Sequence, residues 1–144
     1  MAETTQKRLD RVNRQIASSV KQFSSALEKA AENIIPSMLV ELQTQLVLDL
    51  LRRVVLKTPV DTGRARGNWQ VGIGEIPDGI LDRTADPQAI IAAAEKKLEQ
   101  LGFGEIVWVA NNLEYVTFLE DGSSQQAPAG MLRLSLAELE TIFK

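Results

Sequence analysis

The sequence predicts an α+β fold: long N-terminal helices, kinked or broken near Pro36, a small sheet with helices packed on it, and a C-terminal helix. Apolar residues near the start of the chain recur every three or four positions, which is the spacing of one helix face. Residues 69–73 and 105–110 have the alternation or the β-branched and aromatic content of short strands. We expect a single domain, in which residues 1–57 form a helical arm and residues 58–144 form an α+β body.

Composition and charge limit the possible functions. Of the 144 residues, 44% are hydrophobic and 24% are charged, as in soluble globular proteins. The net charge of −3 argues against a dedicated nucleic-acid-binding protein. Cysteine and histidine are absent, which excludes disulfides, zinc fingers, thiol nucleophiles and Ser-His-Asp triads. These absences disfavour an enzyme without excluding one, and the missing cysteines fit a protein of a reducing cytosol. We expect no metal or cofactor.

The first helix is expected to carry one apolar stripe over about 27 residues, or about 40 Å. A compact domain of this size has a radius of gyration of about 15 Å, so we expect the helix either to bend or to meet a neighbouring molecule. The stripe consists of Leu9, Val12, Ile16, Val20, Phe23, Leu27, Ala30 and Ile34.

Pro36 is expected to kink or break this helix, or to lie in the first turn of a second one. The second helix, over residues 37–57, is apolar around most of its circumference, which is typical of a helix central to a core or shared between subunits. Charged residues interrupt the apolar stretch from Ile34 to Leu56, so we expect no membrane span. The polar N-terminus predicts no signal peptide.

A specified turn is predicted directly after the second helix. Pro59 fixes one φ angle, Asp61 is expected to accept backbone N–H groups two residues on, and Gly63 permits a positive φ. Arg64 and Arg66 are expected to pair with Asp61 and brace the turn rather than to bind phosphate.

Caps define the next elements. A loop is expected over residues 74–85. Asp86 and Pro87 begin a helix that runs to Leu101, with Gly102 as its C-cap.

The last elements follow from periodicity. The strand over residues 105–110 has apolar residues on both sides, so we expect both of its faces to be covered. A short helix is expected over residues 113–120. The final helix, after Pro128, has a stripe of Leu132, Leu136, Leu139 and Phe143.

Charge is unevenly divided along the chain. Residues 1–57 carry a net charge of +3 and residues 58–144 a net charge of −6, which suits head-to-tail contacts between copies. The first helix begins with a basic group, Lys7, Arg8 and Arg11 followed by Arg14, that could contact nucleic acid by counterion release. Interleaved acidic residues favour a solvated face instead.

Candidate enzyme sites are weak. Glu114, Glu120 and Asp121 could provide an acid–base pair. The spacing of six between Glu114 and Glu120 places these two on different faces of a helix, which favours a structural or solvated role. The GxG fragments that begin at Gly72 and Gly102 lack the context of a dinucleotide site and are interpreted as turn or cap glycines.

Two segments are not explained by composition. The first is Thr58-Pro-Val-Asp-Thr-Gly-Arg-Ala-Arg-Gly-Asn-Trp69. The second runs from Asn111-Asn-Leu-Glu-Tyr115 through Phe118-Leu-Glu-Asp-Gly122 to Ser124-Gln-Gln-Ala-Pro-Ala-Gly-Met131. Here the sequence closely resembles the neck, or tail-completion, proteins of tailed bacteriophages and prophages. In that family a helix ends in TPVDTGRAR-x-NW, and NN-x-x-Y, LE-x-G, QAP and a closing helix that begins GM follow in this order.

The resemblance implies a small, non-enzymatic subunit of a ring, a hexamer or dodecamer, in the connector between capsid portal and tail tube. The implied partners are further copies, head-closure or adaptor proteins on the head side, and a tail terminator or the tail tube on the tail side. DNA would only pass through the channel, and the protein would lie at the head–tail junction of the virion after synthesis in the bacterial cytoplasm. The residues carried over from the motifs are Thr58, Pro59, Asp61, Thr62, Gly63, Arg64, Arg66, Trp69, Asn111, Tyr115, Leu119, Glu120, Gly122, Gln126, Pro128 and Gly130.

The sequence departs from the family at two positions and leaves alternatives open. Asp121 stands where the family often has an aromatic residue, and Val116 where alanine is common. The alternatives are a tail terminator that caps the tail tube, an accessory nucleic-acid-binding protein that uses the basic first helix, and a carboxylate hydrolase centred on Glu114 or Glu120.

Overall fold

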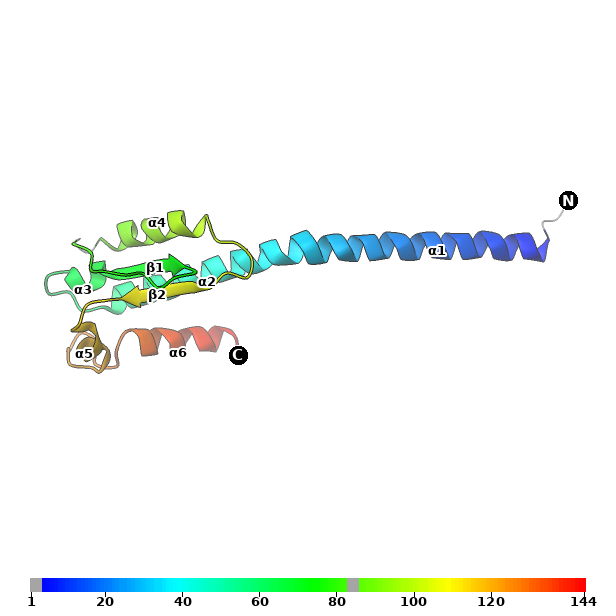
Figure 1. Ribbon diagram of the computed structural model, residues 1–144. Helices are drawn as coiled ribbons and strands as arrows, with labels where there is room; N and C mark the ends of the chain where they lie inside the picture. The colour runs from blue at the N-terminus through cyan, green and yellow to red at the C-terminus, as the bar shows by residue number, and fades with distance from the viewer. Residues whose placement is uncertain (1–3, 83–85) are drawn as a thin grey trace. The chain divides into compact units, whose positions relative to one another are not determined.

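The structure is a computed structural model that describes residues 4–82 and 86–144 of the chain. Within these residues the expected α+β class is confirmed, with helices and a two-stranded antiparallel sheet (Figure 1). Backbone contacts divide the chain into two compact units, Met1–Leu39 and Val40–Lys144. Residues 40–57, expected in the arm, belong to the second unit.

The first unit is helical and contains a π-helical turn. It comprises α1 (Thr5–Lys29), η1 (Ala30–Ile34) and the start of α2 (Ile35–Lys57). Pro36 lies in the first turn of α2, which was one of the expected placements, and the helix continues through it. The N–H of Ile35 donates to the carbonyl five residues back. This wider turn accommodates the proline, which lacks an N–H and whose ring crowds the carbonyl four residues back.

The helical segment Thr5–Lys57 contains a stretch that is long and apolar enough, by length and composition alone, to cross a membrane. Core helices of soluble proteins meet the same criterion. In this segment Leu48, Leu51, Val54 and Val55 are buried in the core of the second unit. That the chain has no membrane partner therefore stays a prediction.

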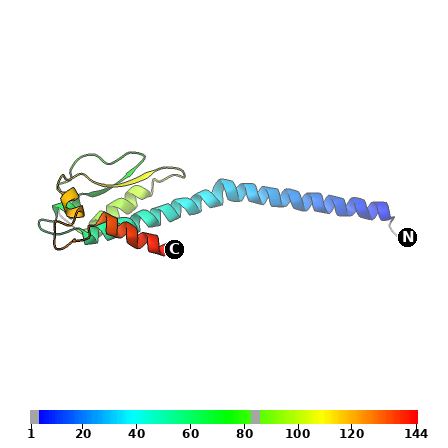
Figure 2. The same ribbon diagram turned by 90° about the horizontal axis from the view of Figure 1, so that it is seen from below.

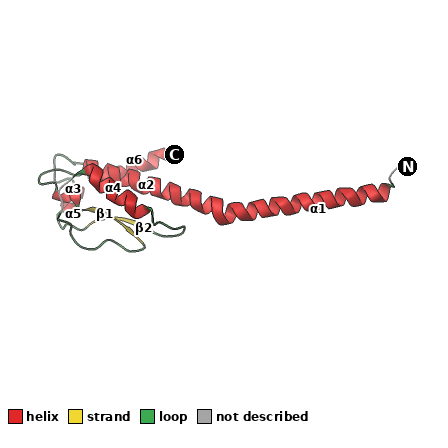
Figure 3. Ribbon diagram, turned by 90° about the horizontal axis from the view of Figure 1, so that it is seen from above, coloured by secondary structure: helices red, strands yellow, loops and turns green. Residues whose placement is uncertain are grey.

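The second unit has two layers. Figures 2 and 3 show the sheet on one side of the layer formed by α2, α4 (Pro87–Leu98) and α6 (Leu132–Ile142). Figure 1 shows α4 and α6 on opposite sides of α2. The buried core is formed by Leu48, Leu51, Val54, Val55, Trp69, Val71, Ile90, Ala94, Leu98, Leu101, Ala127 and Met131.

The sheet pairs β1 (Trp69–Ile73) with β2 (Val107–Asn111) in antiparallel register, with Trp69 opposite Asn111. The expectation that both faces of the second strand are covered is wrong. The side chains of Ile106 and Trp108 are 61% and 38% exposed, because the helices cover only the other face of the sheet. The strand also begins two residues later than expected.

The helix α4 begins as predicted, since the Asp86 carboxylate accepts the N–H of Gln88 at 3.0 Å. It ends at Leu98, before the expected end at Leu101, and Gly102 is not its cap. The N–H of Gly102 instead donates to the Glu105 carboxylate at 2.6 Å, and the left-handed glycine of this turn is Gly104. The expected loop is present over residues 74–82, and residues 83–85 lie outside the described part of the chain.

Two short helices complete the second unit, α3 (Arg64–Gly67) and α5 (Val116–Glu120). The helix expected from Leu113 begins three residues later, because residues 113–115 form a turn. In α6 the predicted stripe is only partly covered: Leu139 is buried and Leu132 half-buried, whereas Leu136 and Phe143 are exposed.

Candidate functional site

The two motif segments, far apart in the sequence, lie against each other in the second unit. The backbone N–H of Val60 donates to the Gln126 side-chain oxygen at 3.0 Å. The Asn111 side-chain amide donates to the Ala65 carbonyl at 2.8 Å. Each of these bonds joins the first motif to the second, so the motif residues form one structural site.

Thr58 and Arg66 close the end of α2. The Thr58 hydroxyl donates to the Val54 carbonyl at 2.5 Å and accepts the indole N–H of Trp69 at 2.7 Å, and both side chains are buried. The Arg66 guanidinium donates to the carbonyls of Leu56 and Thr58 at 3.4 and 3.2 Å. A cation is favourable there because the last carbonyls of a helix lack intrahelical partners and carry partial negative charge.

The turn between α2 and α3 differs from the prediction in two contacts. The Thr62 hydroxyl, rather than the Asp61 carboxylate, accepts a backbone N–H two residues on, from Arg64 at 3.3 Å. Arg66 braces the turn through carbonyls of the helix end rather than through Asp61. The positive φ of Gly63 is confirmed at 81°.

Two asparagines that the sequence analysis did not single out hold the loop after β1. Asn68 is fully buried, accepts the N–H of Leu81 at 2.7 Å, and donates to the carbonyls of Leu81 and Arg64. Asn112 donates to the carbonyls of Pro77 and Gly79, both at 2.9 Å. Their positions in the NW and NN parts of the motifs could have identified them from the sequence.

Glu120 fixes the start of α6. Its carboxylate accepts the backbone N–H groups of Met131, Leu132 and Arg133 at 2.8, 2.9 and 2.7 Å. Partial burial alone would raise the pKa of this carboxyl. The three amide hydrogen bonds outweigh burial and hold the pKa below its ordinary value of 4.5. The side chain thus serves as a helix cap supplied from another element.

The glycines of the second motif allow this contact. A Cβ on Gly130, whose φ is 82°, would lie 2.6 Å from the Glu120 carbonyl oxygen. A Cβ on Gly122 would lie 2.5 Å from the Pro128 carbonyl oxygen, so Pro128 and both glycines belong to the same packed loop. At one departure from the family, Asp121, the side chain lies 3.9 Å from the Arg133 guanidinium, with both groups exposed. At the other, Val116 is half-buried and packs on the core.

A surface cavity of about 590 Å³ is lined by residues of both motifs. Its lining includes a carboxylate, a guanidinium, a phenol and several hydroxyl groups. Among the described residues, no group of three Asp or Glu side chains could hold a metal ion. The cavity is lined by Pro59, Asp61, Thr62, Gly63, Arg64, Ala65, Tyr115, Leu119, Ser123, Ser124 and Gln126.

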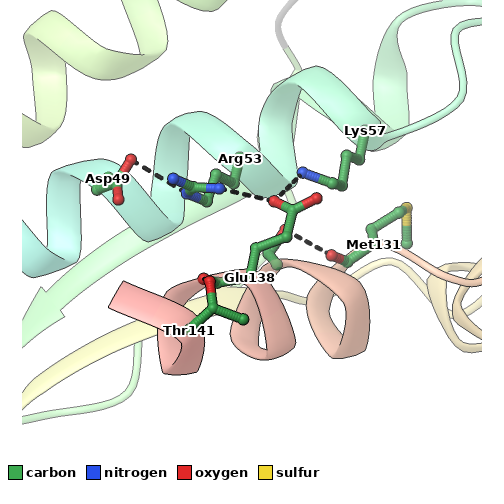
Figure 4. Close-up of polar contacts among 7 residues, drawn as sticks. Asp49, Arg53, Lys57, Met131, Glu138 and Thr141 are labelled. Atoms are coloured by element: carbon green, nitrogen blue, oxygen red, sulfur yellow. Dashed lines mark hydrogen bonds and ion pairs between the residues drawn. The ribbon is translucent and has the colours of Figure 1, made fainter. Parts of the chain in front are cut away.

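A second polar cluster joins α2 to α6 (Figure 4). One Glu138 oxygen lies 2.7 Å from both the Arg53 guanidinium and the Lys57 ammonium, and Arg53 also bonds Asp49 at 3.2 Å. Hydrogen bonds from Lys57 and Arg53 lower the pKa of Glu138, and the bonds to Glu138 and Asp49 raise the pKa of Arg53. This cluster positions α6 along α2, beside the site.

No model of a known protein family matches this chain, and no curated protein or solved structure is significantly similar to it.

Proposed function

We propose that this chain is a structural subunit of a bacteriophage head–tail connector, a neck protein that forms a ring, completes the tail and joins it to the DNA-filled head. The observation that carries the proposal is the convergence of both motif segments. The Val60–Gln126 and Asn111–Ala65 bonds and the Glu120 cap bring residues shared with the neck proteins into one site. Residues that matched the family only by chance would not be expected to contact one another in the fold.

Exposed apolar surface gives independent support for a role in assembly. The side chain of Phe23 in α1 is 67% exposed, and α1 has no buried residue among those described. Large exposed apolar surfaces mark contacts with other molecules. In the proposed virion, copies of the chain contact one another in a ring, with adaptor proteins on the head side and the tail terminator or tube on the tail side.

Electron microscopy of lysates from the parent phage or prophage tests the proposal directly. After deletion of the gene, we expect separate DNA-filled heads and separate tails of normal length, with joined particles restored by complementation. Tails of uncontrolled length would identify the terminator instead. Intact infectious particles would overturn the proposal.

The nucleic-acid-binding alternative makes a different prediction. It requires DNA affinity that falls steeply as salt increases, because binding by the basic start of α1 would release counterions. A gel-shift titration near physiological salt separates the two functions. We expect no measurable binding of double-stranded DNA.

A further inference from the structure

We propose that α1 pairs with α1 of a second copy of the chain, through a coiled-coil seam on one helix face. This inference stands on the helix alone and does not depend on the proposed phage function. The seam consists of six residues, Leu9, Val12, Ile16, Val20, Phe23 and Leu27.

The seam is exposed and keeps to one face of the helix. Its side chains are between 46% and 67% exposed. From Leu9 to Leu27 the chain advances 18 residues in five steps, or about 3.6 residues per step, the period of a straight α-helix. The seam therefore continues along α1 and stops before the π-helical turn, where the residues per turn change.

The seam is too narrow for packing on a broad surface. A helix on a globular core has three or four apolar residues in every two turns, whereas a coiled-coil seam has about two. Between Leu9 and Leu27 the only apolar residues outside the seam are Ala17 and Ala26. The fitting partner is another helix whose side chains interdigitate with this single row.

The side chains that flank the seam suit a second copy as that partner. The helix has six basic and two acidic residues, so an approach through the charged face would be repulsive. At 3.6 residues per turn, Arg11, Arg14, Lys21 and Lys29 lie on the half opposite the seam. Among the charged residues Arg8 lies beside the seam, at its first turn, and the other positions beside it include Asn13, Ser19 and Ser24, which are small or uncharged. Two copies can therefore meet along the seam with most of their like charges turned outward.

Sedimentation of the full chain tests the pairing. We expect the wild-type protein to sediment as two or more chains of 15.9 kDa, and Phe23→Asp to lose that association. Ser25→Asp is the matched control, because it adds the same charge two residues away on the opposite half of the helix. We expect this variant to sediment with the same number of chains as the wild type. Circular dichroism checks that both variants keep the thermal transition of the wild type.

If copies also associate through surfaces outside the seam, Phe23→Asp would still sediment as an oligomer. Crosslinking tests the seam directly in that case. Because the chain has no cysteine, Val20→Cys and Ser18→Cys each provide a single thiol. Val20 lies near the middle of the seam, so the two copies of this position are close in a parallel or an antiparallel pair, whereas Ser18 lies on the opposite half of the helix. With a short bis-maleimide, we expect a crosslinked pair from Val20→Cys and none from Ser18→Cys.

Three results would overturn the pairing: a monomeric wild-type protein, equal crosslinking at both positions, or no crosslinking at Val20. If the monomer instead binds vesicles of phosphatidylserine and phosphatidylcholine, α1 is a membrane-surface helix.

Discussion

At the scale of single residues, Glu120 shows how a side chain can supply what the local sequence lacks. The first four N–H groups of a helix have no intrahelical partners. The residue at the N-cap of α6 is Met131, whose side chain cannot accept them. Glu120, eleven residues before Met131, accepts two of these groups with one oxygen and a third with the other.

Replacing Glu120 by Gln should lower the free energy of unfolding by about 1–2 kcal/mol, since one charged acceptor of three amides is lost. The folded-state pKa of Glu120 lies below 4.5, so the carboxylate stabilises the fold fully above that pH. Its contribution disappears as the pH falls through the folded pKa. In urea titrations, the difference between wild type and Glu120→Gln should therefore shrink below about pH 4.5.

Glu114→Gln is the control for this experiment, because that side chain is exposed. A difference between wild type and Glu120→Gln that stays constant down to low pH would contradict the capping role.

Gly63→Val should destabilise the protein by about 2 kcal/mol, because a β-branched residue resists the left-handed conformation. Gly63 has a φ of 81° at the turn between α2 and α3. Gly63→Asn, which tolerates this conformation, should retain more stability than Gly63→Val. Thermal unfolding of the two variants measures the difference, and a valine variant as stable as wild type would refute the assigned turn.

At the scale of elements, the docking of α6 on α2 depends on few groups. Leu139 is the buried apolar residue of α6, while Leu136 and Phe143 remain exposed. The cluster of Glu138 with Arg53 and Lys57 supplies polar contacts between the two helices.

Glu138→Gln should lower the melting temperature, and the loss should be smaller in about 1 M salt, where the screening length falls to about 3 Å. The loss should also shrink below pH 4.5, because the lowered pKa of Glu138 means that its pairing stabilises the fold only while the carboxylate is ionised. Glu140→Gln is the control, since its contact with Lys144 is 3.9 Å long and exposed. Equal losses at low and high salt would show that charge does not position α6.

Elements with a clear period were predictable, and contacts between elements were not. Local patterns could be recognised from the sequence because they depend on residues that are close along the chain. Examples are the apolar stripe of α1, the alternation in β1 and the Asp86 cap. The face of Trp108 illustrates the limit: apolar residues on both sides of a strand do not reveal whether the chain itself covers them. The motifs drew attention to Glu120, but its contact with the start of α6 depends on packing that no local pattern encodes.

At the scale of the whole molecule, the core and the site belong to one unit. Every residue of the buried core cluster lies between Leu48 and Met131, within the unit Val40–Lys144. The bonds that join the two motifs lie in the same unit.

A fragment of residues 40–144 should fold by itself. We expect a cooperative urea transition with a midpoint close to that of the full chain, because the fragment keeps the whole core cluster. It should also sediment as a single chain if α1 mediates pairing. A fragment without a cooperative transition would show that the first unit is needed for folding.

The contact of Glu120 with the first turn of α6 also closes residues 121–130 into a loop that is held at its base. Because the two ends of residues 121–130 are held together at the base, doubling the loop would add only about 0.6 kcal/mol of closure entropy. Gln125 is exposed within this loop. Closure entropy would therefore tolerate a longer loop, but the packing would not: Gln126 bonds Val60 and Ala127 is buried in the core, so an insertion beside Gln125 should keep the Glu120 contact and still lower the stability of the fold.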